Sequence, residues 1–453
     1  MLIGLGTRMV TRAVLWATRL FYDVSRIGPR LPGGPVLVVA NHPNSIIDAL
    51  VVFYAAGRKV HPLARAPLFE RPVIGQVLRE LGGLPVYRPQ DDPELVGRNA
   101  ATFDAAIAAL VNGDAVLIFP EGMSHSEPEL APLRTGAARI ALRAEAAGAW
   151  SLGLQIVPVG LTYRRKTLFR GEAAAYIGAP LRIGAWRGRW ETADTDTVRD
   201  LTREIAAALE GVVVEYSGRD NEPLLHAAEA MYHAEHAGTN GAPESDDLAQ
   251  RIPRLQLFAA GMAWLEATDP ARLARLRGAV RVLTQRLARL GLEPGHLPAN
   301  PRARDTVRVL GLDALLVALS APVMLVGIVA WYVPYLLPRL IVRLRPPAYE
   351  ALATVKLVSA LVIFPLAYAA WIAWAAHRAG AWGAVFVALL LPVAGVVALY
   401  GREHAREFRS GLLFRLRTLV RPGLADFLRL RRRAIVQEID RIADEWDAER
   451  GRR

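Results

Sequence analysis

Three long apolar stretches near the C-terminus limit most strongly what this chain can fold into. They cover residues 309–338, 356–376 and 381–400, and the second and third contain almost no interior charge. A helix that crosses the hydrocarbon core of a bilayer needs about 20 consecutive apolar residues. The second and third stretches meet that length, which predicts an integral membrane protein.

Charges around these stretches predict their orientation. Arginines are frequent in residues 339–345 and after residue 402, whereas only residues 377–380 separate the second stretch from the third. Because cytoplasmic flanks are rich in arginine, we expect both flanks in the cytoplasm and the short loop outside. The first stretch contains Pro322, Pro334 and Pro338, which predicts a re-entrant element or helical hairpin and an even number of crossings.

Composition narrows the function classes. The chain has 453 residues, a formal net charge of +12 and no cysteine, which excludes disulfides, thiolate nucleophiles and cysteine-ligated metals. Arginine supplies the basic excess, since Lys59, Lys166 and Lys356 are the only lysines. Two explanations of this excess are open. One is a composition bias of the genome, and the other is binding to anionic partners such as acidic lipid or phosphate-bearing substrates. The apolar stretches favour lipid, and no nucleic-acid partner is expected.

The N-terminal residues 1–30 read as an amphipathic, membrane-associated helix. Four arginines are spaced to share one helical stripe, and apolar side chains fall opposite them. Such a helix lies in the headgroup plane with its arginines towards phosphates. An ordinary amphipathic helix packed on the next domain is the alternative. The stripe consists of Arg8, Arg12, Arg19 and Arg26, and the opposite face of Val10, Val14, Ala17, Phe21 and Val24.

The rest of the chain divides into four regions. Residues 31–215 alternate short β-branched runs with helical patterns, which predicts an α/β fold with helices on the faces of a sheet. Residues 216–308 read as helices, residues 309–402 as the membrane region, and residues 403–453 as a basic, helical cytoplasmic tail. We interpret the basic run at 429–433 as a solvated face that favours acidic lipid.

Polar residues at the ends of the apolar runs carry the candidate chemistry. His42 and Asp48 would not share a face of a regular helix, but Pro43 and Asn44 allow a turn that brings them together, with Asn44 or Ser45 capping the next helix. A carboxylate on one imidazole nitrogen leaves the other free to take a proton from an alcohol. Because this pair has no nucleophile of its own, the nucleophile would be the substrate.

Two further motifs suit a pocket for a phosphorylated polyol. Glu121 lies between a proline and a glycine at a strand end, where it can accept hydrogen bonds from hydroxyl groups. Arg134 precedes another helix start, and Arg88 ends a third apolar run, so both guanidinium groups are candidates for binding phosphate. Each motif alone is weak, because an isolated arginine is more often a solvated surface group.

In this order the motifs resemble those of the glycerolipid acyltransferase superfamily. The likeness covers residues 30–215 and implies a mixed central sheet flanked by helices. Five residues separate His42 from Asp48, one more than is usual in that family. The spacing, together with Ser124-His125 and residues 131–136, resembles the fungal glycerol-3-phosphate/dihydroxyacetone-phosphate acyltransferases. The matching blocks are His42 with Asp48, residues 83–88 (GLPVYR), residues 119–122 (FPEG) and residues 157–160 (VPVG).

The resemblance implies a role for each matching residue. His42 would act as general base and Asp48 would orient it. Glu121, Gly122 and Ser124 would contribute to the acceptor pocket, and Arg65, Arg88 and Arg134 would bind phosphate. No metal or cofactor is implied; acyl-CoA or acyl carrier protein would be the co-substrate, and glycerol 3-phosphate or a lysophospholipid such as lysophosphatidate the acceptor.

The sequence therefore predicts a membrane-bound acyltransferase of phospholipid synthesis. Its catalytic domain would be cytoplasmic, at the inner membrane in a bacterium. A lysolipid or thioester hydrolase is one alternative, although no G-x-S-x-G motif is present to support it. A catalytically silent lipid-binding protein is the other, for which loss of His42 or Asp48 would be the signature.

Overall fold

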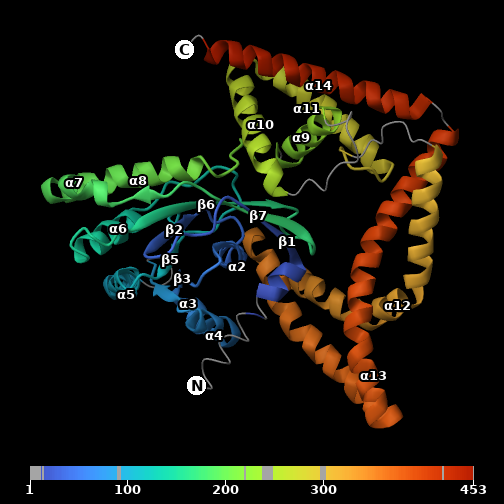
Figure 1. Ribbon diagram of the computed structural model, residues 1–453, viewed down its shortest axis with the longest axis horizontal. Helices are drawn as coiled ribbons and strands as arrows, with labels where there is room; N and C mark the ends of the chain where they lie inside the picture. Colours follow the sequence, from blue (N-terminus) through green and yellow to red (C-terminus); the bar gives the residue numbers. More distant parts are fainter. Residues whose placement is uncertain are drawn as a thin grey trace. The chain divides into compact units, whose positions relative to one another are not determined.

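The computed structural model describes residues 12, 15–88, 93–218, 221–236, 248–295, 303–420 and 423–451 (Figure 1). Its chain divides into two compact units. The first, here called the α/β unit, combines residues 1–219 with 246–256 and 347–357. The second, the helical unit, contains residues 220–245, 257–346 and 358–453.

An eight-stranded sheet forms the centre of the α/β unit. Strands β2 to β6 run parallel to one another, β7 is antiparallel to β6, and β1 is parallel to β7, so the predicted mixed sheet is confirmed. The strand order is β1-β7-β6-β2-β5-β3-β4, with β8 beside β6. The strands are β1 (Tyr22–Ile27), β2 (Val36–Ala40), β3 (Val60–Arg65), β4 (Leu84–Val86), β5 (Ala115–Ile118), β6 (Gln155–Arg164), β7 (Gly171–Ile177) and β8 (Leu181–Arg182).

This topology positions the site. The carboxyl ends of β6, β2, β5, β3 and β4 meet at one edge, because these five strands are neighbours and parallel. Every residue of β2 and β5 is buried, as expected of apolar strands covered on both faces. The helices are α2 (Ile46–Ala56), α3 (Ala66–Phe69), α4 (Pro72–Glu80), α5 (Asn99–Val111), α6 (Gly136–Ala147), α7 (Arg187–Thr192) and α8 (Asp194–Glu210).

The N-terminal helix is shorter than predicted. Residues 15–21 are helical, but residues 22–27 form the edge strand β1, so the expectation of one helix over 1–30 is wrong there. Tyr22 and Val24 are buried with exposed Asp23 between them, which is the alternation of a half-buried strand. Val24 and Arg26 therefore belong to the sheet. Arg8, Val10 and Val14 lie outside the described residues.

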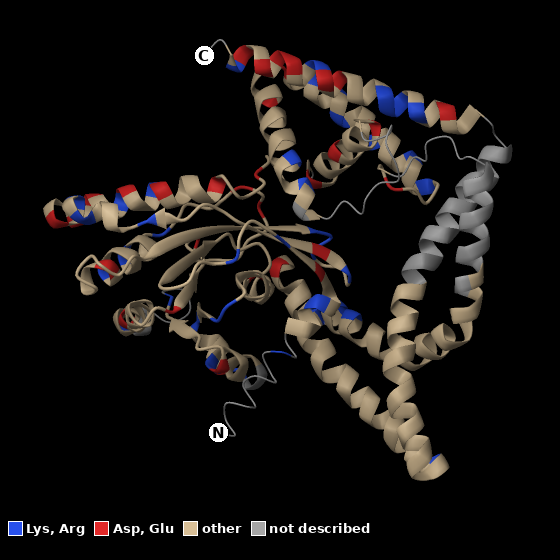
Figure 2. Cartoon of the chain, in the orientation of Figure 1, with Lys and Arg blue, Asp and Glu red and all other residues tan. Residues whose placement is uncertain are grey.

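Helices that precede and follow the apolar stretches pack together in the helical unit. They are α9 (Glu222–His236), residues 257–268 of α10 (Leu248–Thr268), α11 (Pro270–Arg289) and α14 (Gly423–Arg450). Met231 of α9, Leu283 of α11 and Ile435 of α14 share one buried cluster. Figure 2 shows many charged residues along α14. The basic run at 429–433 is not wholly a solvated face, because Arg432 is buried and bonds Glu235 of α9 together with Arg433.

The first apolar stretch forms one long helix. Helix α12 (Ala303–Leu344) contains all three prolines and bends in Figure 1, so the predicted helical hairpin is wrong. Helix α13 (Leu352–Val420) is interrupted at Gly380, whose φ of 69° and ψ of −163° are not helical. Gly380 lies in the segment 377–380, where the sequence predicted a loop between the second and third apolar stretches. Residues 318–344 and 349–401 are long and apolar enough to cross a membrane. Trp331 of α12 donates to the Leu391 carbonyl of α13 at 3.1 Å.

Candidate active site

The turn after β2 brings His42 and Asp48 into contact, as the sequence predicted. His42 Nδ1 lies 2.8 Å from Asp48 Oδ2, and the Asp48 side chain is completely buried. Asn41 fixes the start of the turn by bonding both the amide and the carbonyl of Leu161 in β6. Ser45 closes it with a φ of 53°, and α2 begins at the next residue. The turn is thus held between two neighbouring strands.

Three protein donors surround the Asp48 carboxylate. Besides His42, the backbone amide of Asn44 donates to Oδ2 at 2.7 Å, and the Tyr163 hydroxyl donates to Oδ1 at 2.6 Å. The predicted capping of α2 by the Asn44 or Ser45 side chain is replaced by this arrangement, because the N-cap Ser45 makes no side-chain cap. Tyr163 was not identified from the sequence; its place near the carboxyl end of the proline-containing strand was the available signal.

Two buried tyrosines, Tyr22 and Tyr163, place hydroxyl groups beside Asn44 and Asp48. Burial raises the pKa of Tyr163 well above its usual value, and the negative charge of Asp48 raises it further. Burial also raises the pKa of Tyr22, and a hydrogen bond from Asn44 only partly offsets this effect. Tyr22 donates to the Lys166 carbonyl and accepts from the Asn44 side chain at 2.9 Å. Both phenols remain protonated at neutral pH.

The second ring nitrogen of His42 is available for chemistry. The Asp48 carboxylate only accepts hydrogen bonds, so the Nδ1 atom of His42 carries the proton and Nε2 presents its lone pair. Within the described part of the chain, Nε2 has no hydrogen-bond partner. The ring stacks on Phe119 with centroids 3.9 Å apart, which fixes its plane. His42 lines a small hollow of about 20 Å³ together with Glu121, His125 and residues 127–130.

The FPEG glutamate braces the His42 backbone. Glu121 is buried, and its Oε1 accepts from the His42 amide at 2.8 Å. Its Oε2 accepts from the Ala131 amide at 2.9 Å and contacts His125 Nε2. Ser124 donates to the His42 carbonyl at 2.8 Å and accepts from the Ser45 amide at 3.0 Å. Glu121 and Ser124, two of the three predicted pocket residues, therefore hold the turn that carries His42.

The three predicted phosphate-binding arginines lie at or beyond the carboxyl edge of the sheet. Arg134 packs against Gly122, where a Cβ would come within 2.6 Å of the arginine Nε. Gly122 also has a φ of 73°, so this position requires glycine on both grounds. Arg65 ends β3 and Arg88 follows β4 by two residues. Arg65 and Arg134 are exposed, and Arg88 is half-buried.

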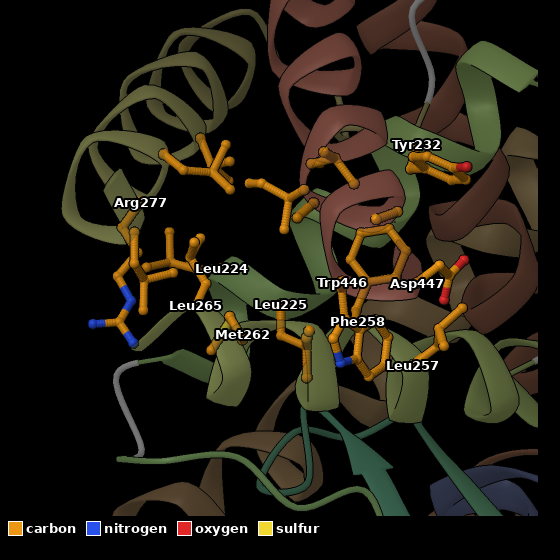
Figure 3. A pocket seen from close by; sticks show the side chains of 18 residues that line it. Leu224, Leu225, Tyr232, Leu257, Phe258, Met262, Leu265, Arg277, Trp446 and Asp447 are labelled. Atoms are coloured by element: carbon orange, nitrogen blue, oxygen red, sulfur yellow. The ribbon is translucent and has the colours of Figure 1, made fainter. Parts of the chain in front are cut away.

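The helical unit contains a second hollow with different chemistry. This apolar cavity has a volume of about 160 Å³, and its walls come from α9, α10, α11 and α14 (Figure 3). Its polar lining groups are Tyr232, Arg277 and Asp447, and the lining includes no histidine, serine or glutamate. It lacks a base paired with a carboxylate, so the His42 hollow is the better candidate for a reaction.

Comparison with known proteins agrees with the motifs and the site geometry. Residues 23–162 match the family model described as Acyltransferase, and this span contains His42, Asp48 and Glu121. Residues 23–162 are therefore similar to an acyltransferase domain. The predicted resemblance to the glycerolipid acyltransferase superfamily is thereby confirmed for this domain.

This chain spans only 16% to 26% of the length of the curated relatives it matches. Glycerol-3-phosphate O-acyltransferase 2 of Saccharomyces cerevisiae is 32% identical over 135 residues, which are 30% of this chain and 18% of the relative. Glycerol-3-phosphate O-acyltransferase 1 of the same yeast is 29% identical over 27% of this chain and 16% of its own length. An uncharacterized acyltransferase of Schizosaccharomyces pombe is 27% identical over 40% of this chain and 26% of its own.

A solved structure was also found. The 1-acyl-sn-glycerophosphate (LPA) acyltransferase PlsC from Thermotoga maritima is 19% identical to this chain and aligns with a TM-score of 0.34. The alignment covers 45% of this chain and 80% of that protein.

Proposed function

We propose that this protein is a membrane-bound glycerolipid O-acyltransferase. It transfers a fatty acyl group from acyl-CoA or acyl carrier protein to a hydroxyl of glycerol 3-phosphate or lysophosphatidate. The products are lysophosphatidate and phosphatidate respectively. The observation that carries this proposal is the His42–Asp48 pair with its unpartnered Nε2, inside a domain that matches the acyltransferase family model.

The proposed reaction uses His42 as general base and then as general acid. Nε2 takes the proton of the acceptor hydroxyl while the hydroxyl oxygen attacks the thioester carbonyl. The new C–O bond forms, the C–S bond breaks, and the proton passes from the imidazolium to the leaving thiolate. Asp48 stabilises the imidazolium formed between these steps. Asn44 and Tyr163 hold the carboxylate in place, so little reorganisation is needed during the reaction.

The acceptor is best described as a phosphate-bearing alcohol. Arg65, Arg88 and Arg134 gather positive charge at the edge where the chain turns towards His42, and guanidinium groups suit phosphate oxygens. The names of the two yeast relatives favour glycerol 3-phosphate over lysophosphatidate. The long apolar segments of α12 and α13 support a membrane location. The catalytic domain lies in the cytoplasm in this proposal, because arginine-rich flanks are expected on that side.

Purified protein in detergent, supplied with labelled acyl-CoA, tests this function. Glycerol 3-phosphate and lysophosphatidate are offered separately, and acyl carrier protein thioester replaces acyl-CoA in a parallel series. We expect label in lysophosphatidate or phosphatidate. Accumulation of free fatty acid without acyl transfer would instead identify a hydrolase.

Replacement of the base tests the mechanism. His42→Ala is expected to lower kcat by about 100- to 10,000-fold, because general base catalysis contributes that much. Circular dichroism should report an unchanged fold, since the hydrogen bonds of the His42 backbone with Glu121 and Ser124 do not depend on its ring. His377→Ala, at an exposed site of α13 three residues before Gly380, is the matched control and should keep the wild-type rate. Equal activity of the two variants would contradict the proposed role of His42.

A further inference from the structure

The link between α12 and α13 belongs structurally to the α/β unit. We call residues 347–357 the connector; it comprises the short 3-10 helix η4 (Tyr349–Ala351) and the first residues of α13. Ala353, Thr354 and Leu357 are buried. The connector is separated by more than 100 residues in sequence from the rest of this unit, apart from residues 246–256. Because it is distant in sequence, the connector must be held in the α/β unit by contacts between side chains and backbone groups rather than by chain continuity.

Lys166 provides the main polar contact between the connector and the catalytic turn. It follows β6 and donates from Nζ to the Pro43 carbonyl at 3.2 Å, one residue beyond His42. The same ammonium donates to Ser126 Oγ at 2.8 Å. Ser126 donates in turn to Glu350 Oε1 of the connector at 3.2 Å. One lysine thus joins the turn that carries His42 to a carboxylate in the connector.

Further contacts strengthen the same junction. The Lys166 ammonium lies 4.8 Å from the centroid of the Tyr349 ring, within the range of a cation–π interaction. Lys356 donates to the Thr167 carbonyl at 2.6 Å. Tyr22, which also bonds Asn44, donates to the Lys166 carbonyl. Two of the three lysines in the chain therefore serve this junction.

We propose that Lys166 is a positioning residue of the acyltransfer reaction and that the connector is part of the active site. This inference rests on the proposed function. Through Pro43, Lys166 sets the position of the His42 turn, and through Ser126 its charge is balanced by Glu350. Lys166 acts on the turn and does not bind the acceptor phosphate, because its ammonium donates to acceptors of the protein itself.

Steady-state kinetics separate positioning from substrate binding. Lys166→Met is expected to lower kcat by about 10- to 100-fold, the scale of a small displacement of a catalytic group. KM for the acceptor should stay within about threefold, because ground-state binding is retained. Lys166→Arg should recover most of the loss. Lys59→Met removes an exposed lysine outside the site and should match the wild type. A tenfold or greater rise in KM at constant kcat, or no effect on kcat, would overturn the proposal.

Cross-linking tests the connector contact independently of activity. The chain has no cysteine, so Ser126→Cys and Glu350→Cys in one full-length chain form a unique pair. A short bismaleimide should join them in detergent-purified protein, and each single variant should give no internal cross-link. A folded double variant that fails to cross-link would overturn the docking of the connector. If the cross-link forms but the wild type transfers no acyl group, the proposed function fails and the docking stands.

Discussion

At the scale of single residues, the site depends on the hydrogen bonds that the Asp48 carboxylate accepts. A completely buried carboxylate is costly unless several donors surround it, and Asp48 accepts from His42, Asn44 and Tyr163. These bonds hold both oxygens and leave the imidazole one orientation. The sequence predicted the His42–Asp48 contact because Pro43 and Asn44 allow a local turn. It could not predict Tyr163, which lies 115 residues further along the chain and reaches Asp48 through the β2–β6 pairing.

Removal of the Tyr163 hydroxyl should show how much the hydrogen bond between Tyr163 and Asp48 contributes to kcat. Tyr163→Phe is expected to lower kcat by about 10- to 100-fold, because a hydrogen bond to a buried charge contributes about 1.5–3 kcal/mol. KM should change little, since the hydroxyl faces Asp48 rather than the hollow. Tyr176→Phe, on β7, makes a matched control with the wild-type rate expected. An unchanged kcat in Tyr163→Phe would show that His42 and Asn44 suffice to orient Asp48.

At the scale of elements, the sequence predicted the sheet more accurately than it predicted the course of the apolar helices. Prolines usually interrupt helices, so three of them in one stretch predicted a re-entrant element or a helical hairpin. In α12 the helix continues and bends, and packing against α13 supports it: a Cβ on Gly327 would lie 2.1 Å from the Ala394 carbonyl. This tertiary support could not be read from the stretch itself. The mixed sheet followed from the family resemblance, whereas strand β1 was hidden by an arginine periodicity that also suits a helix.

An ion-pair cluster between α9 and α14 makes a pH-dependent contribution to stability. Burial raises the pKa of Glu235, but hydrogen bonds from Arg433 and Arg432 outweigh it and hold the pKa below its usual value. A lowered carboxyl pKa means that stability is present above the unfolded value of about 4.3 and is lost as the pH falls through the folded value.

Glu235→Gln should therefore lower the free energy of unfolding by about 1–3 kcal/mol at pH 7, because Arg432 loses its charged partner. The difference from the wild type should shrink as the pH falls below about 4. Denaturant titrations in detergent at several pH values measure both effects. Glu191→Gln removes an exposed pair with Arg187 and should stay within about 0.5 kcal/mol of the wild type. A pH-independent deficit in Glu235→Gln would contradict the charge argument.

At the scale of the whole molecule, chain connectivity restricts the membrane topology. Helix α11 precedes α12 and packs with α14, which follows α13, so we expect both ends of the apolar region on the same side of a bilayer. An even number of crossings results if α13 crosses twice, with its turn at Gly380, and α12 does not cross completely, and we expect this topology. The arginine-rich flanks predict the same even number.

Labelling of intact cells tests this topology. A cysteine at the exposed Arg378 is preferable to one at Gly380, whose positive φ disfavours any side chain. Arg378→Cys is expected to react with a membrane-impermeant maleimide before lysis. Glu191→Cys, exposed on α7, should react only after lysis. Protection of position 378, or early labelling of position 191, would refute the proposed orientation.

The discontinuity of the α/β unit has a consequence for biogenesis. A ribosome completes the main body of this unit about 130 residues before it adds the connector, a delay of roughly 6 to 26 seconds at the usual rate of synthesis. During that interval the nascent chain lacks Glu350 and Tyr349, the partners of Ser126 and Lys166. The α/β unit is thus expected to complete its packing only after the apolar helix α12 has been synthesised, which couples the last step of its folding to the appearance of the first candidate membrane span.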